Sequence, residues 1–388
     1  MSSRDDGLIV VLGARGVVGR RICDALAAAG VPYAIGVRRA VLDPGTESPA
    51  LDAGRGAPIR TEVCDAFDAA SLARAFADAR VVVNAAGPLR ETAAPVLVAA
   101  MAAGAHYLDV GGEQAVMHAL YERHESTVRR AGLVALPGAG LDCMIGDLAA
   151  AWAAQHLAEE PDEGPPVRDT PAPRIAELAP LDEIATSHVY DDLALSAGSQ
   201  RALFGAIGHR PLVWCRDRWE PGRVGQTRRV NVGPALGGER EAIAYAGGEA
   251  ISIPHHVATQ LVTTYASLSR RATGLARLVA HALPLVPRAA AGLLAPYAPP
   301  GDDLTRTRFA IVAQVRRGFS TTQISLRGHD LYRTTAIVTA WAARQLAARG
   351  AGPVGMRAPG ELFRAAPALR ELAREADLAL EPSFVDAG

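Results

Sequence analysis

The pattern of apolar and polar positions divides the chain into two parts with different periods. In the amino-terminal part, short apolar runs alternate with longer segments of helical period. The first run, Leu8–Leu12, is continuously apolar and β-branched, which is typical of a strand buried on both faces of a parallel sheet. A glycine-rich turn follows, then a helical period that ends at Gly30, then a second apolar run over 33–37. This order is half of a dinucleotide-binding βαβ unit.

The same alternation continues to the end of the amino-terminal part. Further apolar runs over 59–64, 81–83, 106–110 and 133–136 predict four more strands, with helical segments between them. Strands that alternate with helices indicate a doubly wound parallel sheet of the Rossmann type. We therefore predict an α/β fold with a dinucleotide-binding domain over 1–146.

Beyond a segment over 159–180 that is rich in proline and acidic residues, the pattern changes. Alternating or β-branched runs predict strands over 183–195, 213–214, 228–232, 249–253, 308–316 and 321–326. They predict a second, α+β domain over 147–330 with a mixed, largely antiparallel sheet. A helical stretch over 256–296 is apolar all round, so we expect it to line a substrate cavity, a homodimer interface or simply the core. The segment over 332–349 is an amphipathic helix.

Composition excludes several classes of chemistry. All 40 basic residues of the 388 are arginine, so Schiff-base catalysis, a Walker A loop and a Tyr-x-x-x-Lys relay are excluded. The formal net charge of −1 gives no reason to expect nucleic acid as a partner. The four cysteines are scattered without metal-ligand spacing, and we expect no metal. With a polar amino terminus that does not resemble a signal peptide, these features predict a cytoplasmic protein.

No segment is expected to insert stably into a membrane. The longest apolar stretch, over 273–299, is interrupted by arginine, histidine and several prolines. Association of this stretch with a membrane surface is a weaker alternative.

The glycine turn carries the main functional prediction. Gly13 turns the chain out of the strand, Gly16 lets the backbone approach a diphosphate, and Gly19 lets helix and strand pack closely. The diphosphate then binds the free N–H groups at the positive end of the helix. We predict that the whole turn contacts the cofactor: Gly13, Ala14, Arg15, Gly16, Val17, Val18 and Gly19. The alternative is a βαβ turn that holds no ligand.

The end of the second strand bears on which dinucleotide is bound. Units that bind NAD usually place a carboxylate there for the ribose 2′-hydroxyl. Here Arg38 and Arg39 occupy the position, and the first carboxylate is Asp43. Arginine grips phosphate with two parallel hydrogen bonds, which favours NADP(H) with its 2′-phosphate, while NAD(H) stays possible. The alternative is that both arginines are solvated surface residues.

Other strand ends meet at the same edge of the sheet, where open α/β sheets bind ligands. Small residues after the fourth strand suit a nucleotide that passes close to the backbone. The cofactor residues predicted at these ends are Asp65, Ala85, Ala86, Gly87, Pro88 and Asp109.

Four segments resemble the saccharopine dehydrogenase-like oxidoreductases: VVLGARGVVGR, VVVNAAGPL, AGAHYLDVGGE and PGAGLDCMIGDL. The resemblance implies a Rossmann domain, an α+β domain with a mixed sheet, and carboxy-terminal helices over 331–388 that return to the Rossmann domain. It also implies hydride transfer between NAD(P) and a C–N or C=C bond, as in saccharopine reductases and trans-acting enoyl reductases. The turn GARGVVG departs from the GATGYTG of many relatives.

Hydride transfer needs a proton donor or acceptor beside the substrate. We name Asp109, His255 and Tyr190 as catalytic candidates, and Glu113, Asp142 and His256 as substrate-binding candidates. His188, which shares a run with Tyr190, and His106 with Tyr107 are further candidates. Asp109 could instead be an N-cap or turn carboxylate, and Asp142 a helix cap.

The prediction is an NAD(P)H-dependent reductase acting on a C=C or C=N bond of a fairly apolar small molecule. The alternatives are a non-redox or scaffold protein with a structurally bound NAD(P), and an amino-acid or polyamine C–N dehydrogenase.

Overall fold

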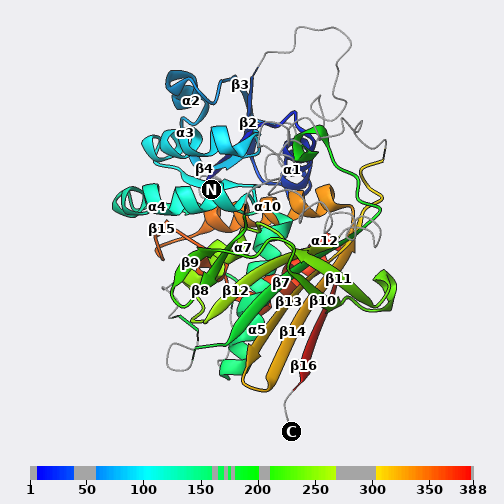
Figure 1. Cartoon of the computed structure of the whole chain (residues 1–388). Helices are drawn as coiled ribbons and strands as arrows, with labels where there is room; N and C mark the ends of the chain where they lie inside the picture. The colour runs from blue at the N-terminus through cyan, green and yellow to red at the C-terminus, as the bar shows by residue number, and fades with distance from the viewer. Residues whose placement is uncertain are drawn as a thin grey trace, which may run out of the picture.

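The computed structural model describes residues 7–38, 58–159, 165–169, 174–175, 180–200, 210–267 and 303–385. These residues build two sheets, seen one above the other in Figure 1. The first sheet is parallel in every pairing, with the order β15-β6-β5-β4-β1-β2-β3. Its strands are β1 (Leu8–Leu12), β2 (Tyr33–Val37), β3 (Arg60–Val63), β4 (Ala79–Asn84), β5 (His106–Asp109), β6 (Val134–Leu136) and β15 (Gly355–Met356).

Helices cover both faces of this sheet. The face packed by α1 (Val17–Ala28) and α10 (Leu331–Ala348) belongs to one apolar core. The opposite face is covered by α2 (Ala69–Ala75), α3 (Leu89–Ala102) and α4 (Gln114–Arg130), whose apolar side chains form a second core. Because connections pass over both faces, the sheet is doubly wound.

The second sheet is mixed and largely antiparallel. Its main path runs β10-β11-β12-β7-β13-β14-β16, and only β12 and β7 pair in parallel. The strands are β7 (Glu183–Asp191), β10 (Thr227–Asn231), β11 (Glu239–Ala244), β12 (Leu261–Ser267), β13 (Arg308–Arg317), β14 (Ser320–His329) and β16 (Ala379–Val385). A hairpin of β8 (Leu212–Cys215) and β9 (Arg218–Pro221) pairs with β12 through β8. The predicted fold class is confirmed.

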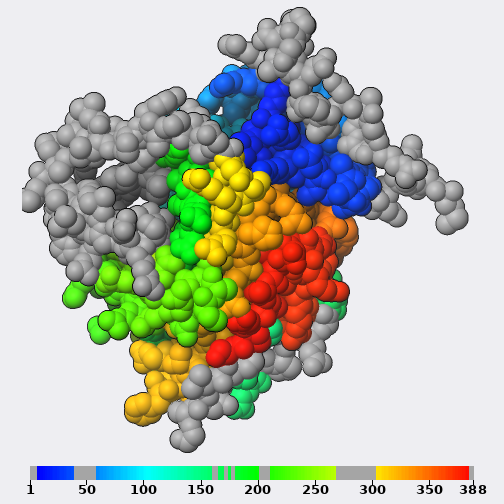
Figure 2. All heavy atoms as spheres, turned by 90° about the vertical axis from the view of Figure 1, so that its right-hand side faces the viewer, coloured from blue at the N-terminus to red at the C-terminus, as the bar shows by residue number. Residues whose placement is uncertain are grey.

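The carboxy-terminal segment is shared between the two sheets. Strand β15 adds to β6 of the first sheet, while β16 adds to β14 of the second. Helix α12 (Ala365–Ala376) packs between α10 and α5 (Gly146–Ala158), and α5 in turn covers β13 and β14. In Figure 2 the blue surface of α1 borders the orange surface of α10 and the red carboxy-terminal surface. The domain boundaries at 146 and 330 stay predictions.

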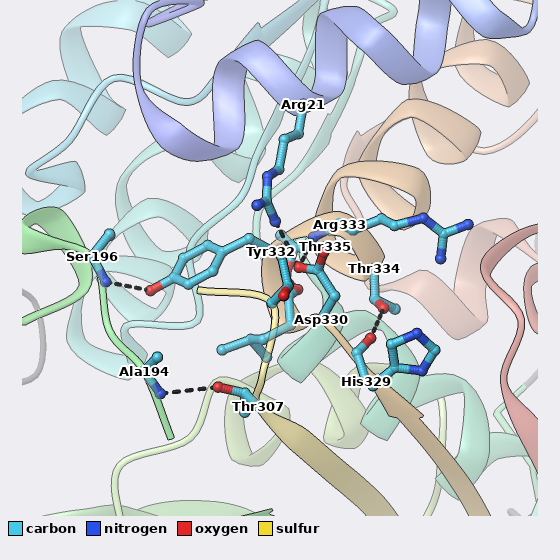
Figure 3. Close-up of polar contacts among 12 residues, drawn as sticks. Arg21, Ala194, Ser196, Thr307, His329, Asp330, Tyr332, Arg333, Thr334 and Thr335 are labelled. Atoms are coloured by element: carbon cyan, nitrogen blue, oxygen red, sulfur yellow. Dashed lines mark hydrogen bonds and ion pairs between the residues drawn. The ribbon is translucent and has the colours of Figure 1, made fainter. Parts of the chain in front are cut away.

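A polar junction fixes the start of α10 against α1 (Figure 3). Asp330 accepts the backbone N–H of Arg333 at 3.0 Å and pairs with Arg21 of α1 at 2.6 Å. Tyr332, at the start of the same helix, accepts the backbone N–H of Ser196 at 2.7 Å. The capping carboxylate therefore joins α10 to α1, and the tyrosine joins it to the loop after β7.

Two predicted elements are wrong. The strand over 249–253 is a short helix, α7 (Glu249–Ser252), followed by a 3-10 turn over Ile253–His255. The helix over 256–296 is contradicted by β12, and its continuation over 268–296 lies outside the described residues. An apolar run of four or five residues fits either period, so periodicity alone does not separate these cases.

None of the helices in the described part of the chain is both long and apolar enough to cross a bilayer. The apolar stretch over 273–299 lies outside that part of the chain.

Candidate functional site

The glycine turn has the geometry of a backbone cradle. Gly13 has a φ of +80°, and a Cβ there would lie 2.7 Å from the carbonyl carbon of Ala85. A Cβ on Gly19 would lie 2.2 Å from the carbonyl oxygen of Gly13. Gly16 is different, because a Cβ there would meet only that same oxygen, at 3.3 Å. Two of the glycines are therefore required by close packing, whereas at Gly16 a Cβ would need only a small shift of one oxygen.

The amino terminus of α1 is the centre of this cradle. Its N-cap residue is Gly16, which offers no side chain to the first N–H groups, and no acidic residue lies in the first turn. Arg15 and Gly16 are exposed, while Ala14 is fully buried. An uncapped helix end with an exposed glycine and an exposed arginine is suited to an anion such as a diphosphate. These residues fit a dinucleotide.

The structure places the other predicted cofactor residues along the same edge of the sheet. Arg38 is exposed directly after β2, and Arg39 lies outside the described residues. Asp65 is exposed after β3, where its Oδ1 accepts the backbone N–H of Phe67 at 2.9 Å. After β4, the backbone of Ala85 and Ala86 lies against Gly13. Gly87 is exposed, and Pro88 is the N-cap residue of α3.

Asp109 belongs to a buried hydrogen-bond network rather than to an open surface. Only 2 % of the residue is exposed. Its Oδ1 accepts the backbone N–H groups of Gly111 at 3.1 Å and Gly138 at 3.0 Å, and its Oδ2 accepts the Tyr107 hydroxyl at 2.8 Å. Asn84 adds its side-chain N–H to the Tyr107 oxygen at 3.4 Å.

This network holds the loops after β4, β5 and β6 together. Burial raises the pKa of Asp109 to about 6, although the hydrogen bond from Gly138 and the others it accepts lower it. The alternative interpretation, in which Asp109 is a turn carboxylate, agrees with the backbone hydrogen bonds that it accepts. Its predicted catalytic role is not supported by any exposed carboxylate oxygen, because both oxygens are used internally.

Asp142 and Tyr190, predicted in different domains, meet at this edge of the sheet. Asp142 lies in a π-helical turn, Leu141–Ile145, between β6 and α5, and 46 % of its side chain is exposed. The Tyr190 hydroxyl of β7 donates to Asp142 Oδ1 at 2.7 Å. The cap residue of the π-helical turn is Gly140, so the capping alternative for Asp142 is wrong. A π-helical turn is frequent at functional sites.

Behind Asp142 lies a buried ion pair. His188 Nδ1 is 3.7 Å from Asp142 Oδ1, and its Nε2 contacts Glu249 Oε1 of α7. The side chains of His188 and Glu249 are fully buried. Burial lowers the pKa of His188, but Glu249 and Asp142 outweigh that effect and raise it to about 10. Burial raises the pKa of Asp142, yet its contacts with His188 and Tyr190 outweigh burial and hold it below its usual value.

Glu113 is adjacent to this cluster through the backbone. It is the half-buried N-cap residue of α4, and it forms an isolated β-bridge with Gly247, two residues before Glu249. Burial raises the pKa of Glu113. The predicted substrate residues Glu113 and Asp142 therefore both lie at the carboxyl edge of the sheet, next to the segment that brings Glu249.

The two predicted histidines lie elsewhere. His255 stacks on Tyr121 of α4 with ring centroids 4.3 Å apart, and burial followed by the charge of His256 lowers its pKa to about 4. His256 is 1 % exposed and contacts Asp147 Oδ2 at 3.0 Å. The two histidines do not begin the predicted helix over 256–296, because the strand β12 follows them. The structure does not bring either into contact with Asp142 or Tyr190.

Asp147 and His256 tie α5 to α11 (Pro359–Leu362), since Asp147 Oδ1 accepts the Gly360 N–H at 2.8 Å. Replacing His256 by alanine should lower the free energy of unfolding by about 3 kcal/mol, because a buried carboxylate loses its partner. The matched change of the partly exposed His118 should cost less than about 1 kcal/mol. Denaturant unfolding measures both. Nucleotide affinity should not change; a stable His256→Ala protein with impaired nucleotide binding would contradict this structural role.

Sequence reasoning missed Glu249, but it named His188 together with Tyr190 as candidates for proton transfer. Residues 188 and 190 are two apart on β7, so they share one face of the sheet. Glu249 gave no comparable signal, because its run was interpreted as a strand.

Comparison with known proteins finds similar sequences for about a third of the chain and similar folds for nearly all of it. The family model described as the saccharopine dehydrogenase NADP binding domain matches residues 9–136. A Caenorhabditis elegans protein named "Lipid droplet localized protein" is 29 % identical over 149 residues, which cover 36 % of this chain and 34 % of that protein. The human "Saccharopine dehydrogenase-like oxidoreductase" is 28 % identical over 152 residues, covering 36 % of this chain and 35 % of its own. The match thus spans about a third of these curated relatives.

Two solved structures share the fold along nearly the whole chain. Apo saccharopine dehydrogenase (L-Glu forming) from Saccharomyces cerevisiae has a TM-score of 0.61 at 13 % identity, covering 98 % of this chain and 100 % of its own. Homospermidine synthase from Legionella pneumophila, in complex with NAD, has a TM-score of 0.63 at 10 % identity, covering 98 % and 92 %. The resemblance predicted from the sequence is confirmed, and these two likenesses concern the fold.

Proposed function

We propose that this chain, which carries a saccharopine dehydrogenase NADP binding domain and resembles saccharopine dehydrogenase-like oxidoreductases, is an NAD(P)H-dependent oxidoreductase. It transfers hydride to a C=C or C=N bond of a fairly apolar small metabolite. The observation that carries the proposal is the amino terminus of α1, which is exposed and has no side-chain cap. Beside it, Gly13 packs closely against the backbone of Ala85.

Different residues along the carboxyl edge of the first sheet have different roles in this proposal. Gly16 and the first turn of α1 bind the diphosphate through backbone N–H groups. The Asp109 network positions the loops after β4, β5 and β6, while Asp142 and Tyr190 face the substrate. When bound, the dinucleotide supplies the hydride, and the protein supplies orientation and electrostatics.

Purified protein tests this proposal directly. Mass analysis of any nucleotide released on denaturation identifies the cofactor. Loss of the near-ultraviolet absorbance of NADPH in a screen of unsaturated and imine-forming metabolites then measures turnover. A nucleotide that stays bound and is never oxidised by any metabolite would favour the alternative of a structural nucleotide.

We also propose that NADP(H) is preferred over NAD(H), with Arg38 in contact with the 2′-phosphate. Changing Arg38 to aspartate should weaken NADPH binding at least about tenfold, since one charged hydrogen-bonding partner is replaced by a repelling carboxylate. The Kd for NADH should change little or improve. Fluorescence titration gives both constants, and Arg60→Asp, an arginine of the neighbouring edge strand β3, is the control. Equal losses for NADPH and NADH in Arg38→Asp would contradict the preference.

A homodimer and a cytoplasmic location stay part of the proposal. Light scattering of the purified protein tests the first. The name of the C. elegans relative suggests an alternative location at lipid surfaces, and flotation with phospholipid vesicles tests it: protein that floats with the vesicles would contradict a purely cytoplasmic location.

A further inference from the structure

Asp142, His188 and Glu249 form a cluster whose charges do not cancel. It contains two carboxylates, Asp142 and Glu249, and one imidazole, His188, which lies between them. With His188 protonated, the three groups carry a net charge of −1. Among the described residues, no arginine forms an ion pair with either carboxylate to cancel that charge. The neighbouring hydroxyls of Tyr190 and Tyr245 are neutral.

Close packing holds the charged side chains of this cluster in place. A Cβ on Gly146 would lie 2.5 Å from Glu249 Oε1, and a Cβ on Gly247 would lie 2.8 Å from Glu249 Oε2. Glu249 Oε2 is buried without a hydrogen-bond partner, and so is His188 Nδ1. The Tyr245 ring lies edge-on to His188 with centroids 5.5 Å apart. The carboxylate and the imidazole are thus fixed in place, and only Asp142 reaches solvent.

Asp142 presents this charge at the carboxyl edge of the first sheet. The Asp109 network joins its loop to the loops after β4 and β5: Asp109 accepts the Gly138 N–H, and the Ala139 N–H donates to the Asp109 carbonyl at 2.8 Å. In open α/β sheets this edge is where a dinucleotide crosses from one half of the sheet to the other. The nicotinamide ring is neutral when reduced and positively charged when oxidised, since loss of hydride removes two electrons with one proton.

We propose that Asp142, backed by the His188–Glu249 pair, makes the site bind the oxidised dinucleotide more tightly than the reduced one. This inference rests on the proposed function. The carboxylate attracts a cationic ring and has little effect on a neutral one, because the attraction between unlike charges is strong near partly buried groups. Asp142 thereby makes the bound reduced cofactor a stronger hydride donor. It acts as an electrostatic residue, and Tyr190 and His188 act as positioning residues.

The test compares two dissociation constants near neutral pH, for NADP⁺ and for NADPH, by calorimetry. Asp142→Asn removes the charge and keeps an oxygen for the Tyr190 hydroxyl. We expect its Kd for NADP⁺ to rise about tenfold and its Kd for NADPH to stay within about twofold. A tenfold change in this ratio corresponds to about 30 mV for a two-electron couple.

Two further variants separate charge from geometry. Tyr190→Phe removes the hydrogen bond that positions Asp142 but keeps the carboxylate, so the ratio of the two constants should change much less than in Asp142→Asn. Asp182→Asn removes a carboxylate of similar exposure, 40 %, that pairs with Arg316 in the second sheet, and it should change neither constant. Thermal unfolding of each variant verifies the fold.

The outcomes are distinct. If Asp142→Asn weakens both nucleotides equally, or changes neither, the inference is overturned while the proposed function stands. If the wild-type protein binds neither nucleotide, the proposed function itself fails. A change of ratio in Tyr190→Phe equal to that in Asp142→Asn would overturn the electrostatic role.

Discussion

Replacing Gly16 by aspartate should abolish dinucleotide binding without unfolding the protein. Gly16 has φ −70° and ψ 164°, a conformation open to any residue, and a Cβ there meets only the Gly13 carbonyl oxygen, at 3.3 Å. That oxygen must yield by a few tenths of an ångström. Aspartate is also a favoured N-cap residue, so α1 should be as stable as before or slightly more so.

The loss of binding comes from the new charge. A carboxylate at the amino terminus of α1 occupies the N–H groups that the diphosphate would use and repels its negative charge. We expect the Kd for NADPH to rise more than about a hundredfold, or about 3 kcal/mol in binding free energy. Calorimetric titration measures the affinity, and thermal unfolding measures the fold.

Gly16→Asn is the matched control. Asparagine caps the helix equally well but carries no charge, so the difference between the two variants isolates repulsion from steric blocking. We expect Gly16→Asn to weaken binding much less than Gly16→Asp. A Gly16→Asp protein that folds and still binds NADPH with wild-type affinity would place the nucleotide elsewhere.

Replacing Asp109 should have the largest effect on stability. Asp109→Ala removes the acceptor of three buried donors, Tyr107 and the backbone of Gly111 and Gly138, and each buried donor left unpaired costs about 1–3 kcal/mol. We expect a loss of at least about 3 kcal/mol in the free energy of unfolding. Asp109→Asn keeps one oxygen for the two backbone donors and should cost clearly less. Denaturant unfolding measures both.

The difference in the free energy of unfolding between the wild-type protein and Asp109→Asn should change with pH in a defined direction. Burial raises the pKa of Asp109 from 3.8 to about 6 in the folded protein, so the protonated form is the one the fold prefers. The stabilisation is therefore full below pH 4 and is lost as the pH rises through about 6. Relative to wild type, Asp109→Asn should gain about 2–3 kcal/mol between pH 4 and pH 7, because asparagine does not ionise. A difference that is flat over this range would contradict the buried, shifted carboxyl.

The amino-terminal domain was predictable because its signals are local. The strand Leu8–Leu12, the glycine turn and the helix that follows are adjacent in sequence, and Gly13 and Gly19 each have a steric reason. The parallel sheet follows from the alternation of strands and helices. The strand β15 was not predicted, because two residues leave no periodic pattern and their pairing with β6 is decided by tertiary contacts.

The second domain was predicted in class but not in detail. Runs such as 308–316 and 321–326 alternate clearly and are found in β13 and β14. The run over 249–253 begins with a short helix whose first residue, Glu249, contacts His188 in the interior, and no local pattern encodes that contact. Strand β12 was hidden within a stretch of apolar residues that also fits a helix.

The site shows the same division between local and long-range information. Asp142 and Tyr190 were each named from their surroundings, but only the fold shows that they form one hydrogen bond at 2.7 Å between the turn after β6 and strand β7. Asp109 was named from its place at a strand end, and that place is correct. Its burial depends on Tyr107 and on the loop at Gly138, which the sequence alone does not bring together.

The central claim is that the amino terminus of α1 binds the diphosphate of a pyridine nucleotide. Titration of the purified wild-type chain with NADPH, followed by calorimetry, tests it most directly. We predict one nucleotide per chain with a Kd in the micromolar range, and a weaker Kd for NADH. If millimolar NADPH and NADH both fail to bind, and no nucleotide is released from the denatured protein, the account is contradicted.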